Sequence, residues 1–303
     1  MAGAWRGVTI ALACLLAEAS AHAQPTRLRP RDVDTLPARP ATARVPYGSD
    51  SLQFGDLRIP EGRGPFPVLV MIHGGCWVHR LANLQNTNAL SDALRDAGVA
   101  TWNVEYRRYD NPGGGWPGTM LDIAAGVDAL RALAARYPLD LSRVVVAGHS
   151  AGGHLAIWAA ARPRLPAGSP LYSPDPLRVH AAIALGGPGD LRDFMTYGQR
   201  SCGEGVIDKL LGGTWDAVPE RWRQASPAEL LPIGVRQRLV VGDADFIMPA
   251  HAREAYVARA RAAGDSVDLV VVPNAGHFEV IAPVGAAWPR VREAIVDVVR
   301  AVR

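Results

Sequence analysis

One serine stands in a pattern that suits a catalytic nucleophile. Ser150 belongs to Gly148-His149-Ser150-Ala151-Gly152-Gly153 and follows an apolar, β-branched run at 143–147. A nucleophile presented on a sharp strand-to-helix turn needs small neighbours, because the turn is strained and its backbone crowds the following helix. The start of that helix would also direct free N–H groups toward an oxyanion. The pattern predicts Ser150 as a nucleophile for acyl transfer, with the amide of Ala151 as one oxyanion donor; an ordinary turn serine is the alternative.

A serine nucleophile needs a histidine that takes its proton. The histidines downstream of the serine are His154, His180, His251 and His277. The first falls on the helix directly after the serine, the second precedes a strand, and the third opens a helix. His277 instead follows the run 267–272, at the carboxyl end of a predicted strand, where ligands bind in open parallel sheets. We therefore predict His277 as the base.

Two acids could orient His277. Asp243 and Asp245 both follow the predicted strand at 239–241. Asp243 directly follows a glycine as the chain leaves the sheet, a position typical of a carboxylate that accepts backbone N–H groups at a turn. Asp245 lies further out on the loop, where a histidine on the next loop is within reach. We predict Asp245 as the orienting acid; Asp190, after an earlier strand, is a weaker alternative.

A glycine-rich loop is predicted to complete the oxyanion hole. The run 68–72 ends in His73-Gly74-Gly75-Cys76-Trp77. Glycine lets the backbone turn its N–H groups into a site without a Cβ in the way. We expect Gly75, with Gly74 or Cys76, to donate to the oxyanion, and His73 to brace the loop.

Large apolar residues near these motifs allow two interpretations. Trp77, Trp116 and Phe246 either line a pocket for an acyl or aryl group or belong to the core. The stretch Glu105-Tyr106-Arg107 ends a predicted strand. It is expected to form a buried ion pair rather than to take part in chemistry.

The elements that must position these residues follow a repeating pattern. Short β-branched runs alternate with stretches of helical period, at 68–72, 100–105, 143–147, 181–185, 238–241 and 267–272. Strands that are apolar on both faces, alternating with helices, indicate an α/β fold with a mostly parallel central sheet and helices on both faces. Residues 51–60 alternate more weakly and suit an edge strand. Residues 189–231 break the rhythm and are predicted to form a short, lid-like insertion.

The start of the chain reads as a targeting signal. Residues 1–23 contain Arg6, an apolar stretch at 8–17 and the small-x-small site Ala21-His22-Ala23. The apolar stretch is about half of the roughly 20 residues that span a bilayer. We expect cleavage after Ala23 and a secreted or periplasmic bacterial protein without stable membrane insertion. Residues 24–48, rich in Pro and Arg, are expected to form an extended arm before a single domain at 49–303.

Composition narrows the function classes further. Of the 32 basic residues in the 303-residue chain all but Lys209 are Arg, and they are scattered, which argues against a nucleic-acid partner. The three Cys and eight His lack metal-ligand spacing, so neither a metal nor another cofactor is expected. Removal of the signal would leave Cys76 and Cys202. In an oxidising compartment these two could form a disulfide, the alternative being two free thiols.

The motifs, in the order in which they occur along the chain, resemble those of the α/β-hydrolase superfamily. The match consists of His73-Gly74-Gly75, Gly148-x-Ser150-x-Gly152-Gly153, Asp245 and Gly276-His277, and it runs from about Asp32 to the C-terminus. It is similar to the serine esterase/lipase branch with an HGG oxyanion loop. The stretch from Asp245 to Pro249 also resembles the D-x-x-x-P segment that carries the acid in this superfamily.

A narrower resemblance concerns the loop itself. The H-G-G-x-W form, with Trp77, resembles kynurenine formamidase-like hydrolases. Cys76 replaces a third glycine, and Glu105-Tyr106-Arg107 replaces the Asp-Tyr-Arg of hormone-sensitive-lipase relatives. Both departures favour the formamidase-like side modestly.

The resemblance implies acyl transfer through an acyl-enzyme, without a cofactor. Carboxylic esters with small or aryl groups are the first expected substrates, and aryl-formamides the second. Short soluble esters are preferred over long-chain fats, because segment 189–231 mixes charges among its apolar residues. A binding module on the same fold is a third interpretation. The presence of Ser150, His277 and an Asp argues against it. Oligomeric state is left open.

Overall fold

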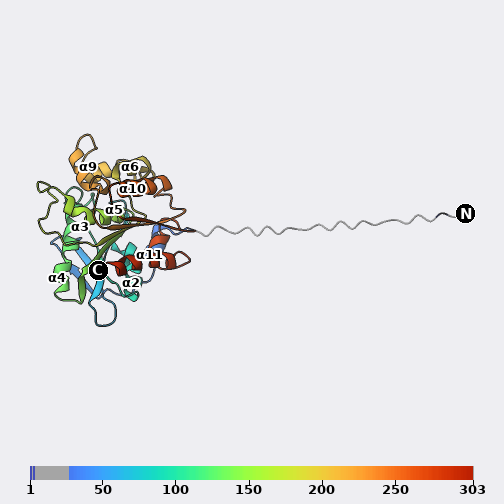
Figure 1. The fold of residues 1–303 in the computed structure, drawn as a ribbon, viewed down its shortest axis with the longest axis horizontal. Coiled ribbons are helices and arrows are strands. Elements are labelled where there is room, and N and C mark those ends of the chain that lie inside the picture. Colours follow the sequence, from blue (N-terminus) through green and yellow to red (C-terminus); the bar gives the residue numbers. More distant parts are fainter. Residues whose placement is uncertain (2, 4–26, 303) are drawn as a thin grey trace.

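A mostly parallel sheet of eight strands forms the centre of the molecule (Figure 1). The computed structural model describes residues 1, 3 and 27–302. The sheet order is β1-β2-β4-β3-β5-β6-β7-β8, with β2 antiparallel to both of its neighbours and the later strands parallel. The strands are β1 Ala43–Pro46, β2 Phe54–Arg58, β3 Phe66–Ile72, β4 Ala100–Val104, β5 Leu139–His149, β6 Ala181–Leu185, β7 Arg236–Gly242 and β8 Val267–Val272.

The predicted alternation of strands and helices is confirmed. Each of the six β-branched runs lies on one of the strands β3 to β8. The interior strand β6 is buried along its whole length, as expected for a strand covered on both faces. Parallel strands end at the same edge of the sheet, so the loops after β3, β5, β7 and β8 meet there.

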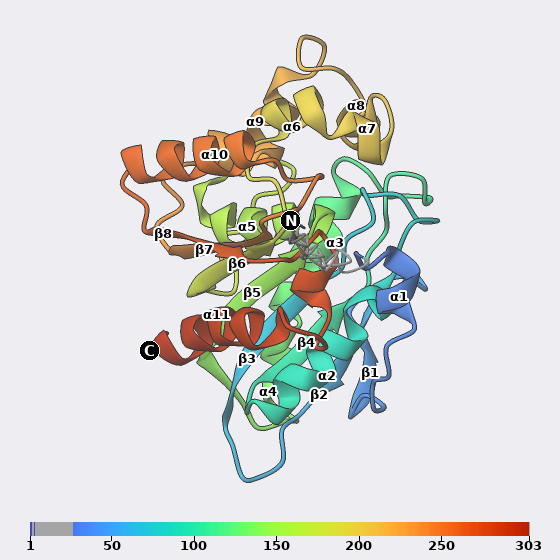
Figure 2. The same cartoon turned by 90° about the vertical axis from the view of Figure 1, so that its right-hand side faces the viewer.

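Helices cover both faces of the sheet. The α-helices are α1 Pro30–Asp34, α2 Asn88–Asp96, α3 Gly118–Asp128, α4 Leu130–Ala134, α5 Ala151–Ala161, α6 Leu191–Tyr197, α7 Gln199–Cys202, α8 Val206–Leu211, α9 Pro219–Ala225, α10 Ala250–Ala262 and α11 Trp288–Ala301. Short 3-10 helices are η1 Leu84–Thr87, η2 Arg162–Arg164, η3 Pro227–Glu229 and η4 Glu279–Ile281. One core lies under α3, α4, α5 and α10, and a second lies under α2 and α11 (Figure 2). Within the described residues, no helix has the length and apolar character needed to cross a bilayer.

The segment 189–231 forms a helical cap beside the sheet. It folds into α6 to α9 and η3, and Figure 2 shows these helices gathered on the side of α5 and α10. Asp190 begins α6 as its N-cap, accepting the N–H groups of Arg192 and Asp193, and also pairs with Arg259. These partners account for the carboxylate of Asp190, so it is not the orienting acid.

The N-terminal arm differs from the prediction. Residues 27–48 are not an extended arm: they contain α1 and the strand β1, which pairs with β2. Residues 51–60 therefore do not supply an edge strand, because β1 occupies the edge. Arg39 also binds Asp92 on α2, with the two charged groups 3.1 Å apart. The predicted signal peptide at 1–23, apart from residues 1 and 3, lies outside the described residues.

Candidate active site

Ser150 lies on a strained turn between β5 and α5. Its φ of 52° and ψ of −120° are costly for a residue with a side chain. The amide of Ser150 donates to the carbonyl of Leu185 at 2.9 Å, which fixes the turn against β6. A Cβ on Gly152 would lie 2.2 Å from the carbonyl oxygen of Ile72, so the turn can pack against β3 only with glycine there. The local sequence thus dictates a tight strand-to-helix turn, with the serine at its apex.

His277 and Asp245 form a buried pair on neighbouring loops. The Nδ1–H of His277 donates to Oδ2 of Asp245 at 2.8 Å, and the two residues are 3% and 6% exposed. The second oxygen, Oδ1, accepts the backbone N–H groups of Ile247 and Met248 at 2.9 and 3.0 Å. Burial by itself would raise the pKa of the Asp245 carboxyl. The hydrogen bond and charge of His277, with the two amides, outweigh it and hold that pKa below its ordinary value.

Asp243 has a different partner from Asp245. Its carboxylate accepts the N–H groups of Asn274 and Ala275 at 3.0 and 3.2 Å. It therefore fixes the loop that leads to His277, as expected of an acid that accepts backbone N–H groups. The structure thus brings Asp245, rather than Asp243, to His277.

His149 supports the same loop from the other side. Its Nε2–H donates to the backbone carbonyl of His277 at 3.0 Å, and the two rings lie 4.6 Å apart. Burial, and the nearby His277, lower the pKa of His149 to about 3. The ring is therefore neutral, and it holds His277 in place without competing for its proton.

The loop after β3 is braced by a buried polar cluster. His73 stacks on Tyr106, its Nδ1–H donates to the carbonyl of Gly74 at 2.8 Å, and its Nε2 lies 3.0 Å from Oε1 of Glu105. Burial acts to raise the pKa of Glu105, but His73, Arg108 and a backbone amide lower it to about 2. His73 has the predicted bracing role. Glu105 does form a buried ion pair, although its arginine partner is Arg108.

Backbone N–H groups near Ser150 are available for an oxyanion. Gly75 has a φ of 102° and Cys76 a φ of 53°, so the loop turns sharply where it passes the serine. The preceding Gly74 is close enough that a Cβ there would lie 3.1 Å from the Cβ of Ser150. Among the described residues, the amides of Gly75, Cys76 and Ala151 donate to no other residue. These amides are free to bind an anionic oxygen.

A cavity of about 340 Å³ contains Ser150 and His277. Its lining residues come from the N-terminal segment, the loop after β3, the turn after β5, α7 and the loops after β7 and β8: Pro30, Gly75, Cys76, Leu81, Ala82, Asn86, His149, Ser150, Arg200, Ser201, Phe246, Ile247, His277 and Phe278. Phe246 is 75% exposed and lines this cavity as predicted. The walls are mostly apolar, which suits an organic acyl or aryl group.

The two predicted tryptophans of the pocket are core residues instead. Trp77 is fully buried and packs edge-on against His154 and Phe194. It follows Cys76 in a second left-handed conformation, with a φ of 57°, and its ring lies in the core rather than in the cavity. Trp116 is partly buried against the same core. Neither residue lines the cavity that holds Ser150.

A disulfide joins the loop after β3 to the helical cap. Cys76 and Cys202 are bonded, with their Cα atoms 5.4 Å apart, so the disulfide hypothesis is confirmed. Cys202 ends α7, whose Arg200 and Ser201 line the cavity. The bond therefore ties one wall of the cavity to the loop that carries the free amides.

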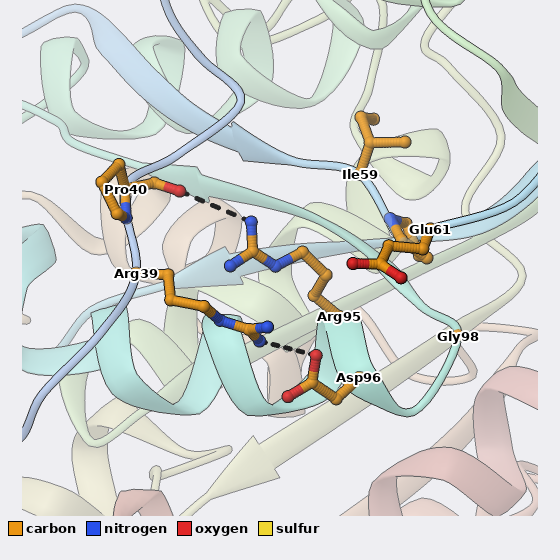
Figure 3. A pocket seen from close by; sticks show the side chains of 8 residues that line it. Arg39, Pro40, Ile59, Glu61, Arg95, Asp96 and Gly98 are labelled. Carbon is orange, nitrogen blue, oxygen red and sulfur yellow. Dashed lines mark hydrogen bonds and ion pairs between the residues drawn. The ribbon is translucent and has the colours of Figure 1, made fainter.

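A larger depression, of about 620 Å³, lies at the opposite end of the sheet (Figure 3). It is lined in part by Gly98, two residues before Ala100, where β4 begins. Its arginines already have partners: Arg39 binds Asp96 at 2.6 Å, and Arg95 donates to the carbonyl of Pro40. Because both of its arginines have partners and no serine or histidine lines it, we assign the active site to the smaller cavity.

Several lining residues were not predicted. Phe278 and Ile247 immediately follow residues that were singled out, so their proximity could have suggested them. Arg200 and Ser201 precede Cys202, and a firm disulfide assignment would have placed them beside Cys76. Nothing in the sequence around Pro30 indicates that it reaches the cavity.

Comparisons with known proteins agree with this architecture. Residues 56–256 match the family model described as BD-FAE. Esterase LipC of Mycobacterium tuberculosis is 31% identical over 77% of this chain, and the match spans 59% of that longer relative. A truncated carbohydrate esterase from gut microbiota superposes with a TM-score of 0.70 at 22% identity, covering 86% of this chain and 98% of that one. An inhibited esterase B from Lactobacillus rhamnosis gives a TM-score of 0.75 at 19% identity, covering 89% and 91%.

The structural matches agree with the overall fold described above. The chain has an α/β-hydrolase fold and belongs to the BD-FAE family.

Proposed function

We propose that this protein is a serine hydrolase that cleaves carboxylic esters of small or aryl substrates. The observation that carries the proposal is the buried hydrogen bond between His277 and Asp245, on the wall of the cavity that also contains Ser150. Because Nδ1 of His277 donates to the acid, its Nε2 keeps a lone pair that can accept the serine proton. The esterase names of the relatives support the same class of reaction.

The first half of the reaction forms an ester on the enzyme. The hydroxyl oxygen of Ser150 attacks the substrate carbonyl carbon while its proton passes to Nε2 of His277. The carbonyl electron pair moves onto oxygen, where the amides of Gly75, Cys76 and Ala151 receive the negative charge. When the intermediate collapses, the bond to the alcohol oxygen breaks and that oxygen takes the proton from His277.

The second half returns the enzyme to its starting state. Water gives a proton to Nε2 of His277 and attacks the acyl carbon. The serine oxygen leaves and regains that proton, and the carboxylic acid is released. Throughout, the ionised Asp245 stabilises the imidazolium form of His277. The low pKa of Asp245 keeps that carboxylate charged at neutral pH.

Replacement of the nucleophile tests this assignment. Ser150→Ala should lower kcat for 4-nitrophenyl butyrate by about 10⁵–10⁶-fold, as in other triads, while the melting temperature stays close to wild type. The wild-type protein should also be labelled by a fluorophosphonate probe, and the variant should not. Turnover within tenfold of wild type in Ser150→Ala would overturn the serine mechanism. Absence of labelling in folded wild type would favour a binding module.

A substrate panel defines the ester class. We expect soluble aryl acetates, aryl butyrates and acetylated sugars to be cleaved much faster than emulsified long-chain triglycerides, because the cap presents charged residues among its apolar ones. N-formylkynurenine tests the formamidase alternative in the same assay. Faster turnover of that amide, or of long-chain fats, would reassign the substrate class.

We also propose that the mature protein is exported. A predicted signal cleaved after Ala23 and the bond between Cys76 and Cys202 both suit an oxidising compartment. N-terminal sequencing of the protein from the periplasm or medium of a bacterial host should give Gln24 as the first residue. Retention of residue 1 in the cytoplasm would contradict export.

A further inference from the structure

We propose that Arg200 selects ester substrates that carry a carboxylate, and this inference rests on the proposed esterase function. Arg200 is an exposed residue of α7 that lines the cavity with Ser150 and His277. It is the lining residue that carries a permanent charge, since the others are apolar, uncharged polar or imidazole side chains. A permanent cation in the cavity of the nucleophile is a specific feature in an otherwise mostly apolar pocket.

The guanidinium of Arg200 has no competing partner among the described residues. It forms no ion pair or side-chain hydrogen bond with them, although Glu204 and Asp208 follow it in the same cap. By contrast, Arg223 of the cap pairs with Glu220, and Arg259 pairs with Asp190 and Glu229. An unpaired guanidinium keeps its forked donor set for a carboxylate of the substrate.

No carboxylate side chain lines this cavity among the described residues. Asp245 binds His277, and Asp34 accepts the side-chain amide of Asn86 at 3.1 Å. A substrate anion would therefore meet one cation and no free carboxylate in this pocket. Direct contact with Arg200 would favour an acidic substrate over its neutral counterpart.

The helix that carries Arg200 is tied to the loop beside the reacting carbonyl. Arg200 lies two residues before Cys202, which is bonded to Cys76 beside the oxyanion amides. A cation carried on this anchored helix can reach an anion only within a limited range of distances from the scissile bond. Arg200 thus determines specificity for a substrate that carries a carboxylate on either its acyl or its alcohol side.

Matched substrate pairs test the proposal. On the acyl side we compare 4-nitrophenyl hydrogen glutarate with its methyl ester, and on the alcohol side 4-acetoxybenzoate with methyl 4-acetoxybenzoate. For each pair the readout is the acidic-to-neutral ratio of kcat/KM, after subtraction of the rate with Ser150→Ala. We expect Arg200→Gln to lower this ratio about tenfold for at least one pair, the worth of one charge-assisted hydrogen bond. Arg200→Glu should lower it further, and added NaCl should reduce the wild-type ratio.

Arg223→Gln is the matched control, because Arg223 is an exposed arginine of the same cap, is paired with Glu220 and lies outside the cavity. It should leave both ratios unchanged, and the neutral esters report whether each variant is folded. A change of less than about threefold in both ratios with Arg200→Gln, or an equal change with Arg223→Gln, overturns the proposal. If wild type cleaves none of these esters, the proposed function itself fails, which is a distinguishable result.

Discussion

Loss of the disulfide between Cys76 and Cys202 should destabilise this protein by several kcal/mol. The bond joins residues 126 positions apart. In the chain-entropy description, a cross-link over a loop of this size restricts the unfolded chain by roughly 5 kcal/mol at 25 °C. Removal of native disulfides from small secreted domains costs about 2–5 kcal/mol. We therefore expect the Cys76→Ser/Cys202→Ser double variant to lose about 3–5 kcal/mol in its free energy of unfolding.

The same change should affect catalysis through the cavity wall. The disulfide holds α7, which carries Arg200 and Ser201, against the loop of Gly75 and Cys76. Without it, binding a substrate must also order that wall, and ordering a side chain costs about 0.5–1.5 kcal/mol. We expect KM for small esters to rise several-fold and kcat to change less, because Ser150 lies on the rigid turn after β5.

Guanidinium unfolding, followed by tryptophan fluorescence, measures the stability effect. A reductant should lower the midpoint of wild type toward that of the double variant and should leave the double variant unchanged. Thiol counting on denatured, unreduced protein gives an independent check. A free energy of unfolding within about 1 kcal/mol of wild type in the double variant, or free thiols at both positions in wild type, would refute the reasoning.

Further substitutions probe the acid, the core and the pocket. Asp245→Asn should lower kcat on the order of 10⁴-fold in a folded protein, whereas Asp243→Asn should retain most turnover and lose about 0.5–2 kcal/mol of stability. Kinetics and urea unfolding measure both effects, and the opposite pattern would assign the orienting role to Asp243. Burial lowers the pKa of His154 from 6.5 to about 4, so the folded protein holds this ring neutral while the unfolded chain protonates it. The free energy of unfolding should therefore decrease as the pH falls from 6.5 toward 4. His154→Gln should flatten that decline in urea midpoints between pH 7 and 5, and an unchanged slope would contradict it. Phe246→Ala should raise KM for aryl esters and lower the free energy of unfolding by less than about 0.5 kcal/mol. Trp77→Ala should lower the free energy of unfolding by about 3–5 kcal/mol. Equal losses of stability would contradict the placement of Phe246 in the cavity and of Trp77 in the core.

The sequence was most informative where backbone geometry follows from topology. Ser150, Asp245 and His277 each follow the carboxyl end of a parallel strand, and such ends meet at one edge of the sheet. Their convergence could therefore be predicted without knowledge of any side-chain contact. Small residues around the serine carry the same information locally, because the turn tolerates nothing larger.

Side-chain direction and long-range pairing could not be predicted in this way. Whether Trp77 faces the cavity or the core depends on the backbone angles of the residues around it, and two successive left-handed residues are not evident from H-G-G-x-W. The N-terminal arm was expected to be extended because it is rich in Pro and Arg, yet β1 joins the sheet through backbone hydrogen bonds, which do not depend on the side chains. Arg39, which binds Asp92 from 53 positions away, adds a contact that no local pattern reveals.

The base of this site is held by more than its acid. The backbone carbonyl of His277 accepts a hydrogen bond from the neutral ring of His149, and Glu279 accepts the amide of the residue just before His277. Asp243 fixes the start of the same loop through two further amides. Because these contacts fix the backbone, Asp245 is left to set the tautomer of the imidazole and to stabilise its charged form. Loss of Asp245 should therefore remove catalysis while leaving the loop in place. The two aspartates differ in role because Asp243 binds backbone amides of the loop, whereas Asp245 binds the imidazole of His277.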